Sequence, residues 1–157
     1  MPALHFERVI DLPPPMVWEA LVDPDLLSGW LADASVDARA GGSAVFRWFD
    51  GAPSTDASIT AYVLHETLTL ATDNRGRWAF ALQPVPGGPR DQSTRLRLTV
   101  TPATARQTEP AERAWPSSLR HLELLLHGHP VDWTAVREQN TDPDPVQTSQ
   151  APVPDAA

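Results

Sequence analysis

Residues 94–127 have the sequence TRLRLTVTPATARQTEPAERAWPSSLRHLELLLH, and the spacing of apolar side chains changes within this stretch. From Thr94 to Val100, apolar and polar residues alternate, which predicts a half-buried antiparallel strand. From Glu112 to His127 the apolar positions recur at steps of four, three and four, which predicts a helix with one buried face. These positions are Trp115, Leu119, Leu122 and Leu126. Both elements must bury their apolar faces, so the stretch predicts an α+β domain closed by a C-terminal helix.

Five stretches upstream have the alternation and the aromatic or β-branched content of strands. They are residues 3–10, 43–50, 57–65, 67–72 and 76–83. Residues 84–89 are rich in proline and glycine, so we expect a loop there. Together with 94–100, these stretches predict a sheet of about six to seven antiparallel strands.

Two short helices are predicted after the first strand. Residues 11–15 break that strand with three prolines, and residues 16–22 follow as a helix with Val17, Trp18 and Leu21 near one face. The sequence Asp23-Pro24-Asp25 predicts the start of a second helix, because Asp is a favourable N-cap and proline is tolerated in the first turn. The predicted architecture is a curved sheet wrapped around the C-terminal helix, with the short helices closing one end.

Composition excludes several classes of chemistry. The chain has 157 residues and no cysteine, which excludes disulfides, zinc–thiolate sites and thiol catalysis. Its 12 basic residues are all arginine, as in an Arg- and Ala-rich coding bias, so a Schiff-base lysine is excluded too. A net charge of −8 disfavours nucleic acid and anionic membranes as partners. No apolar run reaches the ~18 residues that a membrane helix needs, and we expect a cytoplasmic protein.

One domain is predicted over residues 1–138, ending in a short helix at 131–138 through which Trp133 docks on the body. Residues 139–157 combine prolines with small and polar residues and have very few apolar side chains. This composition predicts a disordered, Pro-rich tail.

Several motifs in this order resemble those of the START-like (SRPBCC) superfamily, in the branch named after the activator of the heat-shock-protein-90 ATPase. They are Val17-Trp18-Glu19-Ala20-Leu21, Asp23-Pro24, Gly41-Gly42 before an aromatic strand, Thr94–Thr99, and Trp115 in a C-terminal helix. The resemblance covers residues 4–127 and implies the helix-grip fold, with a cavity between the sheet and the last helix. Because this fold hosts lipid carriers, polyketide cyclases and chaperone cofactors, it does not by itself imply one function.

Aromatic and apolar residues on the predicted inner faces are candidates for the wall of such a cavity. The candidate ligand-binding residues are Phe46, Trp48, Trp78, Phe80, Leu96, Leu98, Trp115, Ser118 and Leu122. Polar contacts would come from Ser118, from Arg47 or Arg97, and from Arg120 and His121. Strand alternation, however, predicts Arg47, Arg77, Arg95 and Arg97 on the outer face. The alternative is that the tryptophans simply fill the core.

The sequence contains no convincing catalytic constellation. The five histidines are not at metal-ligand spacing, and no Gly-x-Ser-x-Gly motif is present, so we expect neither a metal nor a cofactor. Our main hypothesis is a protein, more likely non-enzymatic than not, that binds a small apolar or aromatic molecule such as a lipid or polyketide. A cyclase or dehydratase using the same cavity, and a protein-interaction module, remain alternatives. We expect a monomer or a weak homodimer.

Overall fold

The computed structural model describes residues 3–88 and 92–129 of the chain. The strands are β1 (Leu4–Ile10), β2 (Asp33–Val36), β3 (Ser43–Arg47), β4 (Thr55–Val63), β5 (Thr67–Thr72), β6 (Arg77–Pro86) and β7 (Gln92–Thr101). The helices are α1 (Pro14–Val22), α2 (Pro24–Leu27), the 3₁₀ turn η1 (Ala105–Gln107) and α3 (Thr108–Leu126). The predicted helix at 131–138 and tail at 139–157 lie outside the described residues.

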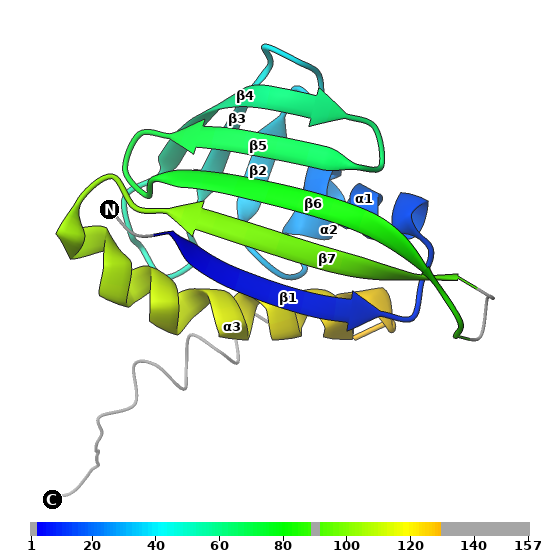
Figure 1. The fold of residues 1–157 in the computed structure, drawn as a ribbon. Coiled ribbons are helices and arrows are strands. Elements are labelled where there is room, and N and C mark those ends of the chain that lie inside the picture. Colours follow the sequence, from blue (N-terminus) through cyan, green and yellow to red (C-terminus); the bar gives the residue numbers. More distant parts are fainter. Residues whose placement is uncertain (1–2, 89–91, 130–157) are drawn as a thin grey trace, which may run out of the picture.

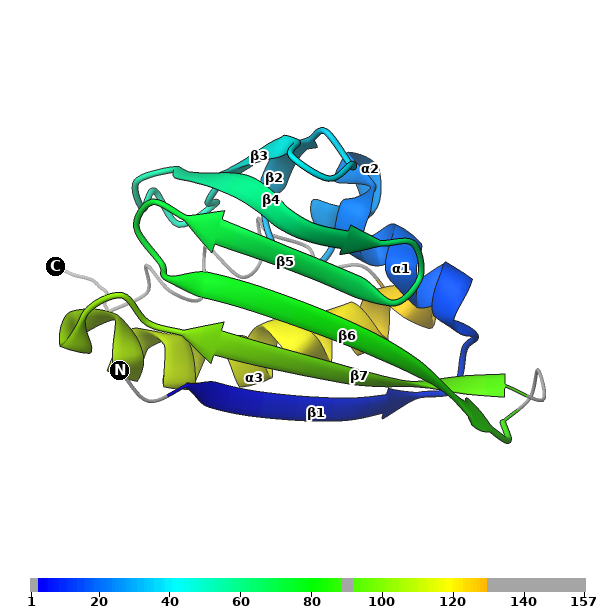
Figure 2. The same cartoon turned by 45° about the horizontal axis from the view of Figure 1, so that its top comes forward.

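The described strands form one antiparallel sheet in the order β1-β7-β6-β5-β4-β3-β2. Strands β2 to β7 follow each other as neighbours, and β1 returns to pair with β7 from Leu4↔Val100 to Ile10↔Thr94. A register shift between Ile59 and Ala61 adds local bending to β4. In Figures 1 and 2 the sheet curls, and α1, α2 and α3 all lie on its concave side. This arrangement confirms the predicted helix-grip fold.

The core lies between the concave face of the sheet and α3. In β6 the buried residues are Trp78, Phe80 and Leu82, and in β7 they are Leu96, Leu98 and Val100. The register pairs Trp78 with Val100 and Phe80 with Leu98, so these side chains share one face. Trp115, Leu119 and Leu122 are the buried residues of α3. The alternation and the helical spacing predicted for these elements are therefore confirmed.

Helix α2 begins as its sequence predicts, whereas α1 begins at Pro14, two residues before the predicted start at residue 16. Pro14 and Pro15 occupy the first turn of α1, where their missing N–H groups cost no hydrogen bond. The Asp23 side chain caps α2 by accepting a hydrogen bond of 2.9 Å from the Asp25 backbone N–H. The Trp30 indole, just after α2, donates to the Ala20 carbonyl at 2.7 Å and joins the two helices.

Several strands differ from the prediction: β3 ends at Arg47 rather than at residue 50, and β4 covers Thr55–Val63 rather than 57–65. The prediction missed β2, an edge strand of only four residues in which Ala34 alone is fully buried, so its apolar signal is weak. The predicted loop at 84–89 is wrong at its start, because β6 continues to Pro86. The Leu82 backbone N–H faces β5 and donates to the Glu66 carbonyl. The pairing of β6 with β5 ends at Ala81, so β6 has no strand on that side beyond this point. The nitrogens of Pro84 and Pro86 face that same open side, where no donor is required.

Helix α3 also begins earlier than predicted, at Thr108 rather than Glu112. Pro110 falls in its first turn, where proline is compatible with a helix. The predicted end is confirmed, since Gly128 follows the helix with φ 88°, the left-handed conformation expected of a C′ glycine.

Candidate functional site

A cavity of about 350 Å³ lies between the start of α3, the β5–β6 turn and the segment after β3. Its lining residues are Leu31, Trp48, Pro53, Asn74, Arg75, Trp78, Arg106, Gln107, Pro110, Ala111, Ala114, Trp115 and Ser118. Pro53, Arg106 and Ala114 are exposed, so the cavity is open to solvent on this side. Its volume falls at the lower end of the range for small-molecule sites.

The sequence of α3 explains why space remains here. Ala111, Ala114 and Ser118 recur at steps of three and four, so they lie on one face of the helix beside the cavity. These side chains are too short to reach the sheet. On the neighbouring stripe of the same helix, Trp115, Leu119 and Leu122 are large and buried, and they close the core. The helix therefore packs on the core through one stripe of large side chains and borders the cavity with a neighbouring stripe of small ones.

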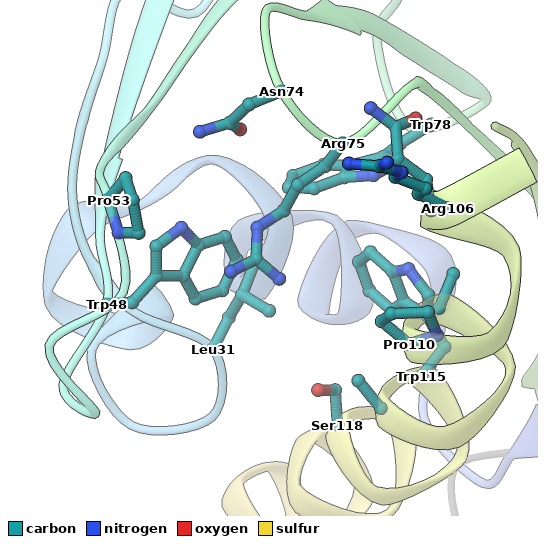
Figure 3. A pocket seen from close by; sticks show the side chains of 13 residues that line it. Leu31, Trp48, Pro53, Asn74, Arg75, Trp78, Arg106, Pro110, Trp115 and Ser118 are labelled. Atoms are coloured by element: carbon teal, nitrogen blue, oxygen red, sulfur yellow. The ribbon is translucent and has the colours of Figure 1, made fainter. Parts of the chain in front are cut away.

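Three indoles form the apolar wall (Figure 3). The rings of Trp78 and Trp115 meet edge to face with centroids 5.1 Å apart, and those of Trp48 and Trp78 are 6.3 Å apart. Such perpendicular contacts suit the charge distribution of aromatic rings. Phe46 packs against Trp78 at 5.3 Å and supports the wall from the core.

A chain of hydrogen bonds holds Trp48 at the cavity. The Trp48 indole donates to the Thr55 hydroxyl at 2.9 Å, and that hydroxyl donates to the Asn74 side-chain oxygen at 2.7 Å. The Asn74 amide in turn donates to the Ser54 carbonyl at 3.0 Å. These bonds tie the segment after β3 to the β5–β6 turn, so the ring of Trp48 has a fixed position.

The β5–β6 turn also carries Arg75 into the cavity. Its backbone N–H donates to the Thr72 hydroxyl at 3.0 Å, and Gly76 follows with φ 79°. The Arg75 guanidinium lies 3.9 Å from the centre of the Trp48 ring, a cation–π geometry. Figure 3 shows Arg75 reaching from its turn to Trp48, with Trp115 across the cavity. Loss of solvation lowers the pKa of this guanidinium, and the charge of Asp50 opposes the shift.

The indole N–H of Trp78 is an unused donor at the same place. The side chain is only 1% exposed, and among the residues the structure describes its nitrogen has no hydrogen-bond partner. Leaving a buried donor unpaired costs about 1–3 kcal/mol. Trp78 lines the cavity with its ring, but its nitrogen has almost no accessible surface in this structure.

Four of the nine predicted cavity residues line this cavity: Trp48, Trp78, Trp115 and Ser118. The other five, Phe46, Phe80, Leu96, Leu98 and Leu122, lie in the packed core. They share the inner face, as predicted, but they lie where the large side chains of the sheet and α3 meet.

The polar residues of the cavity were largely missed. Of those expected from the sequence only Ser118 lines it. Arg47 pairs with Asp33 at 2.9 Å and Arg97 with Glu7 at 3.0 Å, and both guanidinium groups are exposed, as strand alternation predicted for the outer face. Arg75 and Arg106 supply the charge instead. Both lie outside the strands and α3, where no periodicity indicates the direction of a side chain.

One titratable pair lies away from the cavity, between the start of α1 and the end of α3. His127 Nε2 is 2.6 Å from a carboxylate oxygen of Asp11, and His127 Nδ1 is 2.7 Å from the Glu123 carbonyl. The hydrogen bond to Asp11 raises the pKa of His127, and the same bond lowers the pKa of Asp11. Within residues 3–88 and 92–129, no three histidine or acidic side chains gather as metal ligands would. In the same part of the chain, no helix has the length and apolar character to cross a membrane.

Comparison with known proteins fits this geometry. Residues 11–127 match the family model described as Activator of Hsp90 ATPase homolog 1-like protein, over more than half of the chain. The chain belongs to this family. Membership of the AHSA1-like family confirms the resemblance to the START-like (SRPBCC) superfamily.

Solved structures share the AHSA1-like fold. Protein MLL2253 from Mesorhizobium loti is 25% identical with a TM-score of 0.69, over 83% of this chain and 100% of that chain. The Aha1 dimer from Colwellia psychrerythraea is 20% identical with a TM-score of 0.66, over 80% of this chain and 96% of that one. DynU16, from the dynemicin biosynthetic locus, is 18% identical with a TM-score of 0.63, over 82% of this chain and 48% of that one. These last two likenesses show the fold alone. No curated protein matches the sequence.

Proposed function

We propose that this protein binds a small molecule with an aromatic ring system in the cavity between the sheet and α3. The observation that carries the proposal is an open hollow of about 350 Å³ whose wall is three indoles. Apolar walls with a few polar groups are typical of small-molecule sites.

The relatives support a ligand-binding module without naming the ligand. DynU16 comes from the dynemicin biosynthetic locus, so one protein of this fold is associated with the biosynthesis of a small molecule. A lipid and a polyketide-like ring system both remain candidate ligands. The Colwellia protein is a dimer, which supports a weak homodimer as an alternative to a monomer for this chain. Light scattering measures that difference.

The cavity favours binding over catalysis. A cyclase or dehydratase needs a group that moves a proton near neutral pH. Among the described lining residues the ionisable side chains are Arg75 and Arg106, with no histidine, aspartate or glutamate. Guanidinium groups stay protonated and position charge rather than transfer protons. We therefore propose a binding protein rather than an enzyme.

A fluorescent probe and a filled cavity test the proposal. N-phenyl-1-naphthylamine is neutral and aromatic, and we expect it to bind at one saturable site and to quench tryptophan emission. Ser118→Trp should abolish that binding while changing the free energy of unfolding by less than about 1 kcal/mol, because a hollow accepts the added ring. A packed core would instead resist it with about 1–3 kcal/mol of strain.

Ser117→Trp is the matched control. Ser117 is the neighbouring residue on α3 and is exposed, so the same substitution there adds the same ring outside the cavity. We expect this variant to bind the probe as the parent does. No saturable binding by the parent, together with a strongly destabilised Ser118→Trp variant, would show that the indoles only fill the core.

A further inference from the structure

The charge of the cavity is opposite to that of the protein. The chain carries a net charge of −8, yet the described lining residues include Arg75 and Arg106 and no acidic side chain. A neutral apolar ligand gives no reason for this concentration of positive charge. An anionic ligand does, because opposite charges attract most strongly where solvent is reduced.

The pairing of the other arginines makes Arg75 unusual. Six arginines of the described chain lie within 4.0 Å of a carboxylate: Arg8, Arg39, Arg47, Arg95, Arg97 and Arg113. Arg77, Arg106 and Arg120 form no ion pair with a described residue, but they are exposed and water solvates them. Arg75 is half-buried and lies within 4.0 Å of no described carboxylate, although the charge of Asp50 acts on it from further away. A partly desolvated cation without an anion in direct contact is unfavourable.

The orientation of Arg75 leaves its donors available. The guanidinium carbon lies over the Trp48 ring, and no described residue accepts a hydrogen bond from the side-chain N–H groups. The donors of a guanidinium lie in its plane, so a stacked arginine can still bind an oxyanion with two parallel hydrogen bonds.

The N-terminal end of helix α3 adds to the positive electrostatic potential at the cavity. Its first turn, with Pro110 and Ala111, lines the cavity, and no side chain caps its N-terminus. The N-terminal end of a helix carries partial positive charge that favours an anion. Two arginines and this helix end thus lie at one cavity with aromatic walls.

We propose that the ligand is an aromatic anion: a planar ring system held among Trp48, Trp78 and Trp115, with a single carboxylate, sulfonate or phosphate group bound by Arg75 and assisted by Arg106. This inference rests on the proposed function and adds the charge of the ligand to it. A neutral lipid or hydrocarbon would use the indoles and leave Arg75 unpaired.

Two probes with the same rings separate the contributions of shape and charge. 8-Anilinonaphthalene-1-sulfonate has the ring system of N-phenyl-1-naphthylamine with one added sulfonate. We expect the sulfonate probe to bind about tenfold more tightly or better, since charge-assisted hydrogen bonds reach that size. Titration of the intact chain, followed by tryptophan quenching and probe emission, gives both dissociation constants and the stoichiometry.

Arginine variants assign the effect to a residue. Arg75→Gln should weaken binding of the sulfonate probe about tenfold and leave the neutral probe almost unchanged. Arg106→Gln should have a smaller effect in the same direction. Arg77→Gln is the control, because Arg77 is two residues away and exposed at the start of β6, outside the cavity lining, and it removes the same charge. Near-UV dichroism and melting temperature verify that each variant keeps its fold.

The outcomes distinguish this inference from the proposed function. If the two probes bind with equal affinity, or if Arg75→Gln weakens the binding of both equally, the proposed binding of an anion by Arg75 is wrong. The proposed binding of an aromatic ring system would still stand. If Arg77→Gln weakens binding of the sulfonate probe as much as Arg75→Gln does, the proposal is also wrong, because general charge attraction would then explain the binding. Binding of neither probe at a single site would refute the proposed function itself.

Discussion

Gly76 sets the position of Arg75, because it closes the β5–β6 turn beside the cavity. Its φ is 79°, and a Cβ at this residue would lie 2.3 Å from the Thr101 carbonyl oxygen. That oxygen belongs to the backbone at the end of β7, so it cannot move aside as a side chain would. Glycine is therefore required here both by conformation and by the close approach of the next strand.

A pair of alanine variants separates these two requirements. Gly76→Ala should lower the free energy of unfolding by more than about 2 kcal/mol, since backbone strain and a steric clash add together. Gly51 has φ 85°, and a Cβ there would meet no atom within 4 Å, so Gly51→Ala adds strain alone and should cost only about 1 kcal/mol. Urea denaturation measures both. Equal losses would show that the approach of Thr101 does not constrain the turn.

The contact between Asp11 and His127 makes stability depend on pH. The pKa of His127 is raised in the folded protein. The stability that His127 contributes is therefore fully present below its pKa in the unfolded chain, and it is lost as the pH rises through its pKa in the folded protein. The pKa of Asp11 is lowered in the folded protein. The stability that Asp11 contributes is therefore present above its pKa in the unfolded chain, and it is lost as the pH falls through its pKa in the folded protein. The pair should stabilise the fold most between the unfolded values of the two groups, about pH 4 to 6.5.

Replacing one partner tests this contact. In Asp11→Asn the pKa of His127, followed by the NMR shifts of its ring protons, should fall from its raised value. Asp25→Asn removes the same charge at the start of α2, away from His127, and should leave that titration in place. An unchanged His127 titration in Asp11→Asn would mean that the two side chains do not bond in solution.

The elements differ in how much their sequences predict. Strand β7 and helix α3 have long apolar patterns, with Leu96, Leu98 and Val100 in one and Trp115, Leu119 and Leu122 in the other, and both were predicted from spacing. Strand β2 was missed because four residues with one buried alanine give no pattern. Arg75 was missed because it lies in a turn, where the direction of a side chain depends on hydrogen bonds such as that to Thr72. The wall of the cavity could thus be predicted in part, and its charge could not.

Substitutions in helix α3 should strongly destabilise the fold only on its buried face. Leu122 has no exposed surface, so Leu122→Asp buries an unpaired carboxylate and should destabilise the fold by about 3–5 kcal/mol or leave it molten. Leu124 is 39% exposed on the same helix, and Leu124→Asp should change stability by less than about 1 kcal/mol. Near-UV dichroism distinguishes the two. Native dichroism in Leu122→Asp would contradict the packing of α3 on the sheet.

The curled sheet and helix α3 enclose both a packed core and the cavity. Large side chains on one stripe of α3 pack against the sheet, and small side chains on the neighbouring stripe leave space. This division lets one helix both close the core and border the cavity. The site therefore depends on which α3 positions are small, rather than on any added element.

The tryptophans report most directly on whether this hollow binds a ligand. Trp48, Trp78 and Trp115 line the cavity, whereas Trp18 and Trp30 are buried at α1 and after α2, outside its lining. The measurement is a titration of the protein with 8-anilinonaphthalene-1-sulfonate, followed by the indole N–H resonances in ¹H–¹⁵N spectra. We predict that the resonances of Trp48, Trp78 and Trp115 shift together and saturate at one equivalent, while those of Trp18 and Trp30 stay in place. Unchanged spectra, or shifts spread equally over all the tryptophans, would contradict the binding site.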